Sequence, residues 1–229
     1  MDRALTFISC QLQPAGEGQV STKDSGPRRA VTISRQTGSG AHSVAEKLAV
    51  LLQAHTPKDA CPWTIFDRNL VDKVVQEHNL PERVGRFMTE DRTSEIADTV
   101  EELFGLHPPS WLLVRKITET ILHLAELGNV ILIGRGAAVV TATLDHVFHV
   151  RLVSSLEKRV QRIQEVNHLT REAARQLIQK EDRGRERYLK KYFKTDVDDP
   201  LLYHLTINTD LISHDQAARL IADGVLNRA

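Results

Sequence analysis

The sequence predicts an α/β protein with three layers, in which a parallel β-sheet lies between two layers of helices. Short apolar or β-branched segments alternate with segments of helical periodicity, and this alternation is typical of parallel sheets. One segment, Val130–Ile133, is apolar at every position, as expected for a parallel strand covered on both faces. The strands are expected at residues 30–34, 63–66, 130–133, 146–153 and 205–207.

Helix boundaries in the sequence support the same arrangement. Thr170 is expected to cap a long basic helix, and Gly128 stands where a glycine commonly follows a helix. Capping boxes begin at Ser154 and Ser213, because an acidic or amide residue follows each of them three positions later. We expect helices at 42–54, at 111–127, at 171–192, from the box at Ser154 to about 166 and from the box at Ser213 to about 226. Another helix is expected to begin near residue 69, and a polar helical lobe is expected at 80–106.

Length and composition are those of one globular domain. The chain has 229 residues, 41% of them hydrophobic, with 30 basic and 30 acidic side chains. We place the domain at 29–229, behind a flexible tail at 1–28 that is rich in Gly, Ser, Gln and Pro. A formal net charge of zero argues against a general nucleic-acid-binding surface. The oligomeric state is left open by the sequence.

The sequence indicates a cytoplasmic protein. No apolar run approaches the ~18 residues of a membrane span, so we expect no membrane association. Cys10 and Cys61 are far apart and have no His or Cys at metal-ligand spacing, which excludes a disulfide framework and a zinc site. We interpret both as free thiols in a reducing compartment.

The segment after the first strand has the layout of a phosphate cradle. Gly38 and Gly40 lie between a β-branched run and an amphipathic helix, although an ordinary strand-to-helix turn is the alternative. Glycines let backbone N–H groups approach an anion, and the next helix presents its positive end to it. We expect nucleotide phosphates to be bound by Ser34, Arg35, Thr37, Gly38, Ser39, Gly40, Ala41, His42 and Ser43.

This loop lacks the lysine of a Walker motif. With Gly40 as the second glycine of the motif, Ala41 takes the lysine position and His42 takes the position of the magnesium-binding hydroxyl. A register one residue later puts Ser43 on the hydroxyl but misplaces the glycine. The missing positive charge is therefore expected to come from Arg35 or His42, or from arginines elsewhere in the chain.

Three other predicted strands end in polar residues at the same edge of the sheet, where parallel sheets bind ligands, and the last of them ends in Asn208-Thr209. Asp67 and Arg68 follow the second strand, and Asp67 either accepts a hydrogen bond from a substrate or caps the next helix. Arg135, between two glycines, offers a planar guanidinium that matches phosphate oxygens, although it is also compatible with a surface turn. We expect an acceptor substrate to contact Asp67, Arg68, Gly134, Arg135 and Gly136.

The long basic helix is a candidate lid. Arg183 and Arg187 are four residues apart and share a helix face. Charge runs are usually solvated faces, but arginines from a mobile lid neutralise the charge that develops in phosphoryl transfer. Gly184 and residues 194–200 would make such a lid mobile. We therefore expect Arg183 and Arg187 to act in catalysis together with Arg135.

Four motifs, taken together, resemble those of the cytidylate-kinase-like proteins, which are relatives of the P-loop nucleoside-monophosphate (NMP) kinases. The motifs are Ile33-Ser-Arg-Gln-Thr-Gly-Ser-Gly40, Phe66-Asp-Arg68, Ile133-Gly-Arg-Gly136 and Asp182-Arg183. The resemblance covers about residues 30–225. It implies a P-loop kinase core, a helical NMP-binding insert at about 68–110 and a helical lid at about 167–200.

The resemblance also implies roles for individual residues. Residues 38–41 would hold the phosphates of ATP, Arg135 would contact the acceptor nucleotide, and Arg183 and Arg187 would be lid arginines. True cytidylate kinases have lysine where Ala41 stands and aspartate where Gly136 stands. Members of this branch lack the lysine as well, and often have arginine in place of His42.

The leading hypothesis is a phosphotransferase that moves the γ-phosphoryl group of ATP to a nucleoside monophosphate such as CMP. Mg²⁺ would enter with the nucleotide, and the sequence predicts no dedicated protein metal site. Two alternatives remain open, a non-catalytic nucleotide-binding sensor and a kinase of a non-nucleotide small molecule.

Overall fold

The computed structural model describes residues 29–57, 60–67 and 109–228. At their centre is a five-stranded sheet in which every neighbouring pair of strands is parallel, in the order β2-β3-β1-β4-β5. The predicted α/β class is confirmed, and each strand lies close to its predicted position. The strands are β1 Ala30–Arg35, β2 Thr64–Phe66, β3 Val130–Ile133, β4 Val147–Val153 and β5 Leu205–Asn208.

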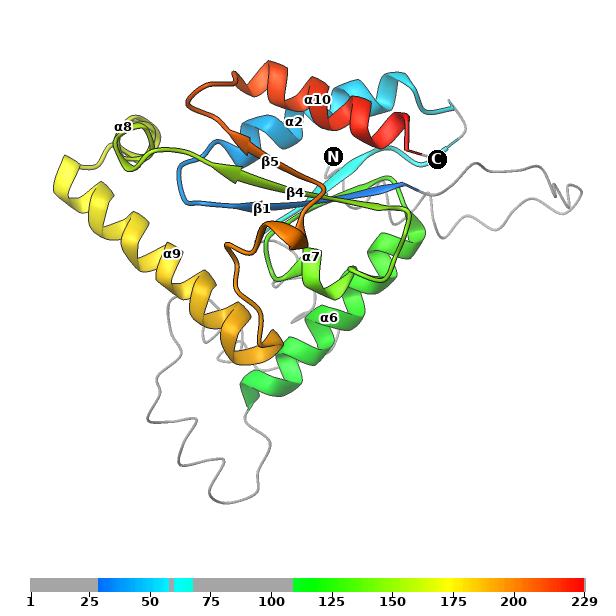
Figure 1. The fold of residues 1–229 in the computed structure, drawn as a ribbon, viewed down its shortest axis with the longest axis horizontal. Helices are drawn as coiled ribbons and strands as arrows, with labels where there is room; N and C mark the ends of the chain where they lie inside the picture. The colour runs from blue at the N-terminus through cyan, green and yellow to red at the C-terminus, as the bar shows by residue number, and fades with distance from the viewer. Residues whose placement is uncertain (1–28, 58–59, 68–108, 229) are drawn as a thin grey trace, which may run out of the picture.

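Helices cover both faces of the sheet (Figure 1). Helices α2 (Ala41–Ala54) and α10 (His214–Leu226) pack side by side on one face. The other face is covered by α6 (Pro109–Leu127), α7 (Ala137–Val140) and the C-terminal part of α9 (Arg171–Phe193). Helix α8 (Leu156–Asn167) packs against the N-terminal part of α9, and a 3₁₀ helix, η1 (Pro200–Leu202), leads into β5.

The alternation of side chains along the strands positions the candidate site. On β1, Val31 and Ile33 are buried against α2 and α10, so Thr32 and Ser34 face the layer that contains α9. In β4, His149 stands opposite Thr32 and Arg151 stands opposite Ser34. Polar side chains are thus paired across two central strands on the α9 face of the sheet.

Most predicted helix caps are confirmed. The Thr170 side chain accepts a hydrogen bond from Ala173 N, and Ser213 forms the complete capping box with Gln216. The box predicted at Ser154 is one residue out of register, because Ser155 caps α8. The Ser154 hydroxyl donates instead to Asp210 Oδ1, a contact that depends on tertiary structure.

Two short elements, α7 and η1, were not predicted. Four-residue and three-residue helices leave too little periodicity in a sequence to be recognised. Helix α6 begins at Pro109, just before the Ser110 that was expected to cap it.

Several predictions fall on residues outside the described part of the chain. They concern the tail at 1–28, the helix from 69, the lobe at 80–106 and nearly all of the insert at 68–110. Cys61 is disulfide-bonded, so the prediction of a free thiol at this position is wrong. A free thiol at Cys61 therefore no longer supports a reducing compartment. Among the described helices, none has the length and apolar character needed to cross a membrane.

Helix α2 offers a direct test of the core. Leu48 is fully buried, whereas Val50 on the same helix is 66% exposed. Leu48→Ala should lower the free energy of unfolding by about 2–5 kcal/mol, because it leaves a cavity between α2 and the sheet. Val50→Ala should change it by less than about 0.5 kcal/mol. Urea unfolding of both variants measures the difference, and equal effects would contradict this packing.

Candidate phosphate-binding site

The loop between β1 and α2 requires both of its glycines. Gly38 and Gly40 have φ angles of +82° and +85°, in the left-handed region that favours glycine. A Cβ at Gly38 would lie 2.9 Å from the carbonyl oxygen of Arg159, and one at Gly40 would lie 2.2 Å from Nε2 of His214. Helices α8 and α10 therefore pack directly on the backbone of this loop.

The N-terminus of α2 is suited to bind an anion. Its N-cap is Gly40, no side chain in the described part of the chain caps it, and its first turn has no acidic residue. The positive end of the helix dipole is thus not neutralised by a carboxylate of the helix itself. Ser39 is fully buried, and within the described residues its Oγ has no hydrogen-bond partner. Phosphate oxygens fit this arrangement, because they would satisfy the hydroxyl and the first N–H groups of the helix.

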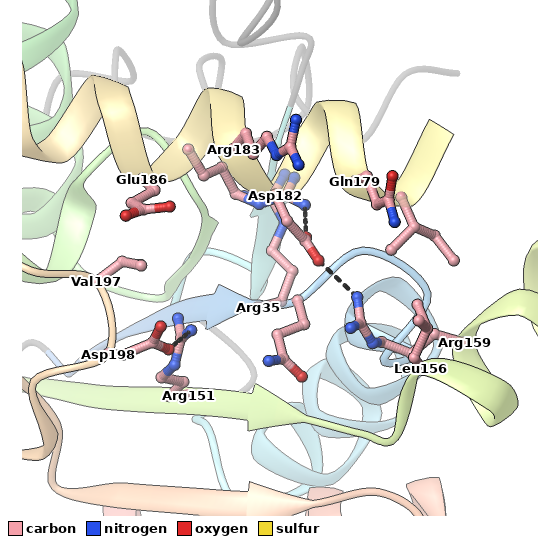
Figure 2. Close-up of a pocket in the computed structure, with 13 residues that line it drawn as sticks. Arg35, Arg151, Leu156, Arg159, Gln179, Asp182, Arg183, Glu186, Val197 and Asp198 are labelled. Carbon is pink, nitrogen blue, oxygen red and sulfur yellow. Dashed lines mark hydrogen bonds and ion pairs between the residues drawn. The ribbon is translucent and has the colours of Figure 1, made fainter. Parts of the chain in front are cut away.

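An arginine-lined cavity of about 250 Å³ opens beside the loop, between β1, β4 and α9 (Figure 2). Five arginines and three carboxylates contribute to its lining, which therefore has a net positive charge. The cavity is bounded on one side by Gln36, the first residue of the glycine loop. The arginines are Arg35, Arg151, Arg159, Arg183 and Arg185, and the carboxylates are Asp182, Glu186 and Asp198.

Asp182 joins the glycine loop to α8 and α9. Its carboxylate accepts a hydrogen bond from Thr37 N at 2.9 Å and forms ion pairs with Arg159 and Arg185, both at 2.5 Å. Burial alone would raise the pKa of Asp182, but the Thr37 N–H and the two guanidinium groups outweigh it and lower the pKa. Thr37 also donates its hydroxyl proton to Glu181 and accepts from Arg185. The predicted phosphate ligand Thr37 is therefore bound to α9 in this structure.

Arg151 is held in the wall of the cavity by two oxygen atoms. Its Nη1 donates to Ser34 Oγ at 2.9 Å, and its Nη2 forms an ion pair with Asp198. The Arg151 side chain is 6% exposed, whereas that of Asp198 is 70% exposed. The Tyr203 hydroxyl lies 3.1 Å from Ser34 Oγ and donates to Val197 O at 2.8 Å. A buried guanidinium is thus kept at the cavity by a carboxylate that solvent can reach.

The Gly134-Arg135-Gly136 motif lies beside Arg35, as its place at the end of β3 predicted. A Cβ at Gly134 would lie 1.9 Å from Arg35 Nη1, so the glycine makes room for that guanidinium. Gly136 caps α7 and packs against Phe193, and Arg135 has a left-handed φ of 56°. Arg35, Arg135 and both glycines line a second, smaller cavity. Arg35 alone of these four also lines the larger cavity.

The first turn of α2 does not place His42 in the arginine-lined cavity. The His42 side chain is 64% exposed and lies 3.3 Å from Glu46 and 3.7 Å from Asp67. Ala41 is buried in the core, and Ser43 Oγ lies 3.3 Å from Nδ1 of His214. In the described segments, no cluster of His, Cys, Asp or Glu side chains could hold a metal ion.

The two predicted lid arginines differ in whether they line the larger cavity. Arg183 lines the larger cavity, whereas Arg187 is exposed on α9 and does not. Gly184 lies within a continuous helix, so the predicted mobility of the lid stays a prediction. Arg68 lies outside the described residues.

Sequence reasoning missed four arginines that converge on the loop and the cavity, as well as His214 over Gly40. The available signals were Arg151, which lies inside an apolar strand, and the pair Arg159 and Arg162, which lie three residues apart on one helix. Neither signal says which loop such side chains contact. The four arginines are Arg151, Arg159, Arg162 and Arg185.

This geometry agrees with comparisons to known proteins. The sequence matches the model of the Cytidylate kinase-like family over residues 30–211, and the chain belongs to that family. The match spans the sheet, the glycine loop and all of α9. A search of the curated proteins finds none that matches.

Two solved structures are similar to this chain to different degrees. An uncharacterized protein from Eubacterium ventriosum has a TM-score of 0.63 and 17% sequence identity, covering 87% of this chain and 99% of its own. A shikimate kinase from Bacteroides thetaiotaomicron has a TM-score of 0.47 and 13% identity, covering 86% of this chain and 98% of its own. The first likeness supports the fold alone, because its identity is low.

Removing the charge of Asp182 should destabilise the protein. Asp182→Asn leaves Arg159 and Arg185 without their shared carboxylate, so we expect a loss of about 1.5–3 kcal/mol at neutral pH. The pKa of Asp182 is lower in the folded state than its ordinary value of 3.8. The stabilisation by its carboxylate is therefore fully present above pH 3.8, and it is lost as the pH falls through the lower pKa of the folded state. Urea unfolding at several pH values measures both effects.

The exposed pair between Arg171 and Glu157 provides the matched control. Glu157→Gln should change the stability little, because both side chains are solvated. An Asp182→Asn variant as stable as Glu157→Gln at neutral pH would show that the carboxylate does not hold the loop to α9.

Proposed function

We propose that this protein is an ATP-dependent phosphotransferase whose glycine loop holds the donor phosphates. The observation that carries the proposal combines three features: a helix N-terminus that no described side chain caps, a glycine loop whose buried Ser39 hydroxyl has no partner among the described residues, and an adjoining cavity rich in arginine. Membership of the Cytidylate kinase-like family supports the same class of reaction. Backbone N–H groups and arginines would then replace the charge of the missing Walker lysine.

The residues at the cavity have distinct parts in this proposal. The N–H groups at the start of α2 and the Ser39 hydroxyl bind phosphate oxygens. Arg35 lines both cavities, so it reaches toward the donor on one side and the acceptor on the other. Phosphoryl transfer needs positioning and neutralisation of charge, and a covalent enzyme intermediate is not required. Mg²⁺ bound to the nucleotide would neutralise further phosphate charge.

The acceptor we propose is a nucleoside monophosphate, with CMP as the first candidate. Arg135 and its glycines line the smaller cavity, and the family resemblance implies that Arg135 contacts the acceptor. The contribution of residues 68–110 to acceptor binding stays a prediction. The second candidate function is a nucleotide-binding sensor without catalysis, which is favoured by the engagement of Thr37 by Asp182.

A coupled assay of ADP release tests the proposal. The purified protein is incubated with MgATP and, in turn, each nucleoside monophosphate and a set of small alcohols. The proposal predicts acceptor-dependent ADP release, fastest with one of the monophosphates. Calorimetric ATP binding without release for any acceptor would favour the sensor, and release only with an alcohol would favour the kinase of a non-nucleotide compound.

Arg35 gives the sharpest single-residue test. Arg35→Gln removes a charge shared by both cavities, so we expect kcat/KM to fall about 10²-fold, with partial recovery in Arg35→Lys. Arg175 is exposed on α9 and lines neither cavity, so Arg175→Gln is the control. Equal activities for the Arg35→Gln and Arg175→Gln variants would contradict the placement of Arg35 at the reacting groups.

A further inference from the structure

Three consecutive carbonyl groups of the glycine loop are bound by side chains from other elements. The donors come from α8 and from the residue that follows β5, and of the three only Arg159 also lines the arginine-lined cavity. Two of the three donors are guanidinium groups, which form the stronger class of hydrogen bond. The contacts are Arg159 Nη1 to Thr37 O at 3.4 Å, Arg162 Nη1 to Gly38 O at 3.2 Å and Thr209 Oγ1 to Ser39 O at 3.0 Å.

These contacts fix the direction of the loop's N–H groups. A trans peptide points its C=O and the following N–H in opposite directions, and the described chain has no cis peptide bond. Carbonyls held toward α8 and β5 therefore turn the N–H groups of Gly38, Ser39 and Gly40 to the other side. Ser39 N–H donates within the loop, to Gln36 O at 3.1 Å. The N–H groups of Gly38 and Gly40 are thereby turned away from the donors of their carbonyls, and such N–H groups could form an anion-binding nest.

Arg162 connects three segments at once. Besides Gly38 O, it donates to Ser154 Oγ at 3.1 Å, to Thr209 Oγ1 at 3.2 Å and to Thr209 O at 3.0 Å. Thr209 is 5% exposed, and its hydroxyl oxygen lies closer to Ser39 O, at 3.0 Å, than to Val153 O, at 3.3 Å.

Asp210 fixes the same junction from the other side. Its carboxylate accepts hydrogen bonds from Ser154 Oγ and from Ser155 N. Burial acts against ionisation, but these hydrogen bonds and the charge of Arg162 lower the pKa of Asp210 to about 2. The carboxylate is thus charged at neutral pH, and it holds the turn between β4 and α8 against the end of β5.

We propose that Arg162 and Thr209 are positioning residues, which bind the loop carbonyls from outside and so preorganise the N–H groups of Gly38 and Gly40 for phosphate. The proposal rests on the proposed function, because it needs a phosphate ligand at the loop. Neither residue touches the ligand. Because Ala41 supplies no side-chain donor inside the loop, the orientation of its backbone N–H groups decides how well phosphate is bound.

Thr209 offers a test that leaves the shape of the site nearly unchanged. Thr209→Val replaces the hydroxyl with a methyl group of similar size, and Thr209→Ser restores the hydroxyl. The probe is inorganic tripolyphosphate, titrated calorimetrically into the full-length protein, so that nucleoside contacts do not contribute. We expect Thr209→Val to weaken binding about tenfold, and Thr209→Ser to bind within about twofold of the wild type.

Arg162→Gln extends the test to the second positioning residue. It should weaken tripolyphosphate binding by at least about tenfold, because Gly38 O and Thr209 O both lose a charged donor. Arg171→Gln removes an arginine from an exposed ion pair on the neighbouring helix, and it should bind as the wild type does. Thermal unfolding of each variant is measured in parallel.

The outcomes separate the two proposals. The positioning role is supported if the wild type binds tripolyphosphate and only Thr209→Val and Arg162→Gln bind it more weakly. Unchanged binding in both variants overturns it, and so does an equal loss in Thr209→Val and Thr209→Ser that follows their thermal stability. A wild-type protein that binds neither tripolyphosphate nor MgATP contradicts the proposed function, and the positioning role for phosphate falls with it.

Discussion

The contact of α8 and α9 with the glycine loop is the constraint on which the candidate site depends. The two glycines with left-handed φ angles do not by themselves fix the backbone conformation of the loop, because glycine samples many backbone states at similar free energy. Here Asp182 binds a loop N–H, while Arg159 and Arg162 bind two of its carbonyls. The loop is therefore shaped by the elements around it, and the same elements bring the arginines that surround the cavity.

This arrangement shows how the proposed phosphate cradle would be supplied with positive charge without a Walker lysine. A lysine within the motif would place one positive charge at the phosphates. In this chain β1, β4, α8 and α9 supply several guanidinium groups to one cavity. The carboxylates of Asp182 and Asp198 balance part of that charge, because closely spaced guanidinium groups would otherwise repel one another. In the proposed function, a bound phosphate would be a further anion for these same guanidinium groups.

The fold was predictable from the sequence because its signals are local. The apolar run of β3 and the capping box at Ser213 each specify an element within a few residues. The closeness of Arg35, next to the glycine loop, and Arg135 was also predictable, since parallel strands bring their carboxyl ends to one edge of the sheet. Arg159 and Arg185 were not predictable, because their roles depend on which part of the loop their helices reach. The shift from Ser154 to Ser155 at the start of α8 has the same cause, because Asp210, far away in the sequence, takes the Ser154 hydroxyl.

Hydrogen exchange at the loop amides tests the central claim most directly. The deuterium uptake of peptides covering residues 36–43 is compared with and without MgATP, by mass spectrometry. Backbone N–H groups that bind phosphate oxygens should exchange more slowly when the nucleotide is present, and the protection should be strongest in this segment. MgATP that binds the protein but leaves exchange in residues 36–43 unchanged would contradict the account.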